Sequence, residues 1–126
     1  MDFTISEYKK LCHTIYKSDY RVLTVKEYLL THPSSNFIII RHDVDRRPLS
    51  ALKMARIEAR FNLFSTYYFR VKTFQPAICQ KIASMGHEIG YHYEVLDRAK
   101  GNYVKAIDLF EEDLSNLRKY CDIKTI

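Results

Sequence analysis

The sequence predicts an α/β protein built from parallel β/α units. Short apolar segments rich in β-branched and aromatic residues alternate with helix-forming segments, the order expected of right-handed parallel crossovers. The 126 residues suit one domain, and 47% hydrophobic and 28% charged residues with only three glycines are typical of a folded globular chain. We therefore expect a single domain, 1–126, whose strands form a parallel sheet or barrel.

The first 35 residues predict an N-terminal helical extension. Two capping-box patterns, each a threonine followed three residues later by a glutamate, predict helices over 4–17 and 25–31. Pro33 ends the second helix before the first strand. We expect this helical pair to pack beneath the sheet.

Residues 36–126 predict the partial barrel itself. Runs of β-branched and aromatic residues, and a last short segment at the chain end, predict strands at 37–40, 63–71, 87–94 and 123–126. Good helix formers between them, with prolines at two starts, predict helices at 48–60, at 76–86 and after Gly101. The last helix carries an apolar stripe suited to packing on a sheet.

Two aspartates follow the first predicted strand. Residues two apart on a strand point to the same face, so Asp43 and Asp45 should project together at the carboxyl end, where α/β proteins place their chemistry. His42 and Val44 should face the other side. A purely structural alternative is that neighbouring arginines neutralise the two carboxylates: Arg41, Arg46 and Arg47.

His92 and Glu94 share one face of the third predicted strand. Together with the aspartates they offer four nitrogen and oxygen ligands from one rim, which suits a divalent metal such as zinc and leaves one carboxylate as a base. Alone, His92 is more typical of a hydrogen-bonded strand histidine. We interpret His87 and Glu88 as structural.

Composition narrows the remaining function classes. The net charge of +5 is spread along the chain, with no basic stripe, so we expect no nucleic-acid partner. Three distant cysteines without a CxxC spacing indicate neither a disulfide framework nor a thiolate zinc site. With no membrane-spanning apolar run and no leader pattern, we expect a cytoplasmic protein.

Three motifs carry a resemblance to a known family. RHDVD, STYYFR and GHEIGYHYE resemble the first half of the polysaccharide deacetylase family, the NodB-like carbohydrate esterases, over about residues 37–118. The resemblance implies a distorted (β/α) barrel, here incomplete. By motif position, Asp43 resembles the catalytic base, Asp45 the metal aspartate and His92 the first metal histidine.

The function implied by this resemblance is metal-dependent hydrolysis of an N-acetyl amide on a carbohydrate. Leu96 stands where the family has its second metal histidine, so either Glu94 replaces that ligand or the metal is lost. The family's later motifs, including its general acid, are not in this chain, so the domain resembles a truncated one. Because the leaving amine then lacks a proton donor, we expect weak turnover or none.

Two other hypotheses remain open. Asp43 and Asp45 also match the DxD pattern of haloacid-dehalogenase-type phosphatases, with Asp43 as nucleophile, although Arg46 departs from that pattern and GHEIGYH stays unexplained. A non-catalytic module would instead pair through an open sheet edge with a second copy or a complementing chain.

Overall fold

The computed structural model describes residues 4–126, which form a mixed α/β fold. The helices of this range are α1 (Ile5–Lys17), α2 (Val25–Thr31), α3 (Pro48–Arg60), α4 (Pro76–Ser84), α5 (Val95–Arg98) and α6 (Tyr103–Leu117). The strands are β1 (Arg21–Leu23), β2 (Phe37–Ile39), β3 (Arg41–Val44), β4 (Thr66–Phe69) and β5 (Glu88–Tyr91). The α/β class predicted from the sequence is confirmed, and these residues form no closed barrel.

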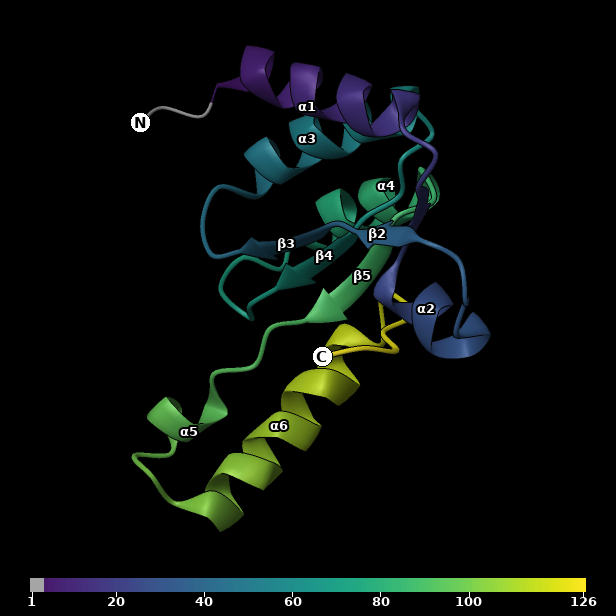
Figure 1. Cartoon of the computed structure of the whole chain (residues 1–126). Helices are drawn as coiled ribbons and strands as arrows, with labels where there is room; N and C mark the ends of the chain where they lie inside the picture. The colour runs from purple at the N-terminus through teal and green to yellow at the C-terminus, as the bar shows by residue number, and fades with distance from the viewer. Residues whose placement is uncertain (1–3) are drawn as a thin grey trace.

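The strands make two small parallel sheets, one ordered β1-β2 and the other β3-β4-β5 (Figure 1). A single strand over 37–40 followed by the aspartates was predicted, and that boundary is wrong: β2 ends at Ile39, and Asp43 lies inside β3. The prediction ended the strand at Ile40 because the residues that follow are polar. Strand pairing depends on backbone groups, however, and a strand continues through Arg41 and His42.

The N-terminal region was predicted to contain helices only, and this prediction is wrong because the region also contains a strand. β1 pairs with β2 in the register Arg21 to Phe37, inside the segment expected to hold helices only. Three residues are too short to show an alternating pattern, so β1 has no sequence signal of its own. Both predicted helices are present, and the Thr24–Glu27 capping box is confirmed in full. α1 packs mainly against α3, and its Tyr8 also contacts His42 of β3.

The three-stranded sheet has one apolar and one polar face. Its register places Val44, Phe69 and Tyr91 side by side, and these residues pack with α3 and α4 in the main core. The opposite face carries Thr66, Tyr68, Glu88 and Gly90. Parallel sheets are normally covered on both faces. We therefore expect this polar face to be covered by hydrogen-bonding groups, whereas the other face is covered by apolar side chains.

The partners of the polar face come from α2 and from the chain end. Glu88 Oε1 accepts hydrogen bonds from Lys26 N–H at 2.9 Å and from Thr66 Oγ1 at 2.9 Å. Its Oε2 accepts from Thr125 Oγ1 at 2.7 Å, and Tyr91 N–H donates to Thr125 O at 3.2 Å. The segment predicted as a strand at 123–126 is therefore irregular rather than a strand, but it lies along β5.

Among residues 4–126, the helices are all too short or too polar to cross a membrane.

Candidate active site

The carboxyl ends of β3, β4 and β5 meet at one edge of the sheet, because the three strands are parallel and in register (Figure 1). Asp43 lies in β3 with Asp45 just beyond it, Arg70 follows β4, and His92 follows β5. Three adjacent loops therefore start from a common rim. That rim is where α/β proteins usually bind ligands.

Asp43 is held by an arginine from its own strand. Arg41 Nε donates to Asp43 Oδ1 at 2.8 Å, and the Arg41 guanidinium stacks 4.1 Å from the ring centre of Tyr68 on the neighbouring strand. Arg41 therefore neutralises the carboxylate, as the structural alternative expected. This contact orients Asp43, because one oxygen is engaged by Arg41 while the other faces His92.

His92 lies between the two aspartates. Its Nε2 is 3.9 Å from Asp43 Oδ2 and 3.8 Å from Asp45 Oδ1, and the imidazole is about one-third exposed at 32%. The backbone fixes its place, since His92 N–H donates to Phe69 O at 2.9 Å and extends the β4–β5 pairing by one residue. Three of the four predicted site residues are thus brought together.

Glu94, the fourth predicted site residue, is engaged elsewhere. Arg70 Nε donates to Glu94 Oε1 at 3.1 Å and Arg70 Nη2 donates to Glu94 Oε2 at 2.7 Å, a bidentate pair. These hydrogen bonds, more than the charge of Arg70, hold the pKa of Glu94 below its usual value despite partial burial. Both carboxylate oxygens face the guanidinium rather than the aspartates.

The donor atoms of Asp43, Asp45 and His92 are of the types that zinc accepts. Two ligand atoms about 2.1 Å from a tetrahedral ion lie about 3.4 Å apart, so the separation of 3.8 Å between His92 Nε2 and Asp45 Oδ1 is a few tenths of an ångström wider than in a closed site. No group of three or more His, Cys, Asp or Glu side chains within residues 4–126 is already arranged to hold an ion. The residues fit a divalent metal in type, and a small closure of the rim would be needed to bind it.

Leu96, which the resemblance would align with a second metal histidine, lies on α5 and lines an apolar groove of about 260 Å³ between α5 and α6. Tyr93 lines the same groove and also a hollow of about 370 Å³ beside the rim. The other residues around this hollow are Arg41, Tyr91, His92 and Ile126. A ligand bound at the rim would therefore meet the Arg41 cation, the His92 imidazole and the exposed Tyr93.

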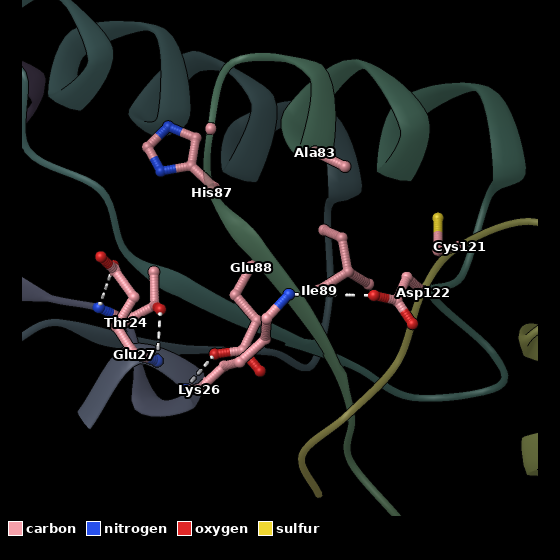
Figure 2. Close-up of a pocket in the computed structure, with 10 residues that line it drawn as sticks. Thr24, Lys26, Glu27, Ala83, His87, Glu88, Ile89, Cys121 and Asp122 are labelled. Carbon is pink, nitrogen blue, oxygen red and sulfur yellow. Dashed lines mark hydrogen bonds and ion pairs between the residues drawn. The ribbon is translucent and has the colours of Figure 1, made fainter. Parts of the chain in front are cut away.

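A second hollow, of about 240 Å³, lies at the opposite end of β5 and is shown in Figure 2. Its polar groups are already paired: Lys26 Nζ lies 3.8 Å from Asp122 Oδ2, and Glu88 accepts the hydrogen bonds described above. His87 is buried, accepting from Ser65 N–H at 3.0 Å through Nδ1. His87 and Glu88 make buried structural hydrogen bonds here, in agreement with their structural interpretation from the sequence.

Arg70 is a residue of the rim that was not predicted from the sequence. Its guanidinium joins Glu94 to the backbone of Asp45, whose carbonyl oxygen accepts from Arg70 Nη1 at 3.3 Å. The available signal was its position, because an arginine directly after a buried parallel strand lies on the same rim as the aspartates.

Comparisons with protein-family models, curated proteins and solved structures give no match to this chain.

Proposed function

We propose that this chain is a polysaccharide deacetylase-like protein that binds a divalent metal, most simply zinc, at the rim formed by Asp43, Asp45 and His92. The observation that carries the proposal is the position of His92 Nε2, within 4 Å of a carboxylate oxygen of each aspartate. The three sequence motifs support it, since RHDVD and GHEIGYHYE supply these three side chains and STYYFR supplies the strand between them. On this proposal the two sheets are part of a distorted (β/α) barrel.

The proposed reaction is hydrolysis of an N-acetyl amide on a carbohydrate. A bound divalent ion supplies polarisation of the acyl carbonyl and stabilisation of the developing negative charge. Asp43 is the base: Arg41 fixes Oδ1, and Oδ2 faces the centre of the site and accepts the proton of the attacking water. Because these residues include no separate general acid, the leaving amine can take only the proton that Asp43 has accepted when the C–N bond breaks, and we expect slow turnover at most. Asp45 and His92 are the ligands.

The surroundings of the rim suit a sugar. Tyr93, at 53% exposed, lines the hollow beside His92. Tyrosine offers an apolar face and a hydroxyl together, which matches the alternation of C–H faces and hydroxyl groups on a sugar ring. Arg41 lines the same hollow and adds hydrogen-bond donors to it.

The proposal is tested by titrating the purified 126-residue chain with zinc in a calorimeter, which measures both the stoichiometry and the affinity of binding. We expect one zinc ion per chain, and at least a tenfold loss of affinity in His92→Ala and in Asp45→Asn, because each removes a ligand. His13→Ala is the matched control, since His13 is exposed on α1, away from the rim. Absence of stoichiometric binding, or equal affinity in His92→Ala, would show that the rim is not a metal site.

The edge strand favours a second candidate, a pairing module. β3 ends the sheet order β3-β4-β5, so its outer edge has no strand partner within residues 4–126. Such an edge can accept a strand from a second copy or another chain. Sedimentation decides between the two: a strictly monomeric chain that binds zinc supports the enzyme-like proposal, whereas a zinc-free dimer supports pairing.

A further inference from the structure

The loops that carry the proposed ligands are joined by one side chain. Arg70 begins the loop after β4, the middle strand of the sheet, and its guanidinium reaches both neighbouring loops. On one side Nη1 donates to the backbone carbonyl of Asp45, and on the other Nε and Nη2 donate to the carboxylate of Glu94. The β3–α3 loop and the β5–α5 loop are therefore tied through β4.

The loop of Arg70 is itself fixed to the sheet. Thr73, buried at 6% exposed, donates through Oγ1 to Val44 O at 2.6 Å and accepts from Arg70 N–H at 3.1 Å. Arg70 thus has an anchored backbone, and its side chain is only 23% exposed. A planar guanidinium with a bidentate carboxylate partner has a defined orientation, unlike a flexible surface ion pair.

The geometry points to Arg70 as a positioning residue that sets the separation between Asp45 and His92, with Glu94 as its partner rather than as a metal ligand. This inference rests on the proposed function, and it assigns to that site two residues with no direct contact to the ion. Partners that orient ligands in this way typically contribute 10- to 100-fold to metal affinity.

The test uses the 126-residue chain with Arg70→Gln, Arg70→Lys and, as the matched control, Lys72→Gln. Lys72 is an exposed cation two residues further along the same loop, so its loss changes the charge but not the contacts to Asp45 and Glu94. Zinc affinity is measured by calorimetry, and amide hydrogen exchange reports segments 43–47 and 92–96. Thermal unfolding checks that each variant is folded.

We expect Arg70→Gln to weaken zinc binding 10- to 100-fold and to speed exchange in both segments, because both loops lose their common tie. Arg70→Lys should recover only part of the affinity, since an ammonium cannot make the bidentate pair. Lys72→Gln should behave like the wild-type chain. Glu94→Gln should weaken binding less than His92→Ala, because it loosens one loop without removing a ligand.

Tighter zinc binding in Arg70→Gln would overturn the inference, because it would mean that Arg70 competes with the metal for Glu94. Unchanged affinity together with unchanged exchange would overturn it as well. If the wild-type chain binds no zinc, the proposed function fails, and the exchange measurement then decides alone: faster exchange in both segments supports the positioning role of Arg70, and unchanged exchange rejects it.

Discussion

Glu58 is completely buried on α3, and its Oε2 lies 2.7 Å from Nε2 of His42 on β3. Ser65 Oγ donates to the same oxygen at 2.7 Å, and the hydroxyls of Tyr8 and Tyr67 donate to the carboxylate as well. The network joins two helices and two strands. Because His42 directly precedes Asp43, the network also anchors the strand that carries the candidate base.

Replacing Glu58 should be strongly destabilising. In Glu58→Gln the buried carboxylate that His42 Nε2, Ser65 Oγ and the two tyrosine hydroxyls contact is lost, and the amide NH₂ faces hydroxyl donors in place of an acceptor. We expect the free energy of unfolding to fall by about 3 kcal/mol or more, the usual cost of removing one partner from a buried charged network.

Urea unfolding at pH 7 measures this free energy. Glu112→Gln, on the exposed side of α6, should change the value by about 0.5 kcal/mol or less. A loss below about 1 kcal/mol in Glu58→Gln would mean that the network adds little stability.

His87 should make the fold sensitive to mild acid. Its Nδ1 accepts from Ser65 N–H at 3.0 Å and its Nε2 donates to Ala55 O at 2.8 Å. Protonation leaves the second bond in place but converts Nδ1 into a donor, so the bond from Ser65 requires the neutral ring. Burial, above all, lowers the pKa of His87 from its usual 6.5. The unfolded chain therefore binds this proton at a higher pH than the folded chain, and the stability that His87 contributes is present above about pH 6.5 and lost as the pH falls below it.

Urea unfolding between pH 8 and pH 5.5 checks this expectation. The free energy of unfolding should decrease on the acid side of pH 6.5, and His87→Gln should show a smaller decrease than the wild-type chain. His13→Gln, at an exposed position, should keep the wild-type pH dependence. Equal pH dependence in His87→Gln and wild type would assign the acid sensitivity to other groups. Glu58, whose pKa is lowered because His42 and two tyrosine hydroxyls outweigh burial, contributes a separate loss only below about pH 4.5.

Gly90 should tolerate no side chain. A Cβ at this position would lie 2.4 Å from the ring of Tyr68 and 3.1 Å from Thr125 O. Tyr68 cannot move away easily, because its hydroxyl is hydrogen-bonded to Thr125 Oγ1 at 2.8 Å and Arg41 covers its ring. We expect Gly90→Ala to lower the free energy of unfolding by about 1–3 kcal/mol, as overpacking usually does.

The Gly90 variant should also weaken zinc binding, because any shift of Tyr68 displaces Arg41 and with it Asp43. Gly101→Ala is the control, because it shows what the replacement of a glycine by alanine costs where the added Cβ meets no neighbouring atom. Gly101 has φ of +82° and nothing within 4 Å of its added Cβ, so it should cost only about 1 kcal/mol of backbone strain and leave zinc affinity unchanged. Thermal unfolding and zinc calorimetry of both variants decide the matter.

The parts of the fold that the sequence predicts well are those with strong local signals. α3 has the predicted bounds, because Pro48 fixes its first turn and good helix formers continue to Arg60. The Thr24–Glu27 capping box likewise gave the start of α2. In contrast, β1 and α5 have three and four residues, and their existence depends on neighbours rather than on their own pattern.

The candidate site likewise contains contacts that the sequence predicts and contacts that it does not. The proximity of Asp43, Asp45 and His92 could be predicted, because strand periodicity and parallel pairing place such residues on one rim. The pairing of Glu94 with Arg70 could not, since it depends on how two irregular loops fold. Long charged side chains find partners in three dimensions, and no spacing in the sequence encodes that choice.

The last prediction concerns α6, which is tied to the sheet by a buried carboxylate. Asp113 Oδ2 accepts from the Tyr91 hydroxyl at 2.7 Å and from Arg98 Nη1 at 2.6 Å, so one side chain links β5, α5 and α6. In Asp113→Asn the charge that holds Arg98 is lost, whereas the amide oxygen can still accept from Tyr91. We therefore expect a modest loss of stability, about 1 kcal/mol, together with faster hydrogen exchange in α5. Asp108→Asn, on the exposed side of the same helix, should change neither quantity. Unchanged exchange in α5 of Asp113→Asn would mean that the apolar contacts of Val95 and Ala99 with Ala106 are sufficient to hold the two helices together.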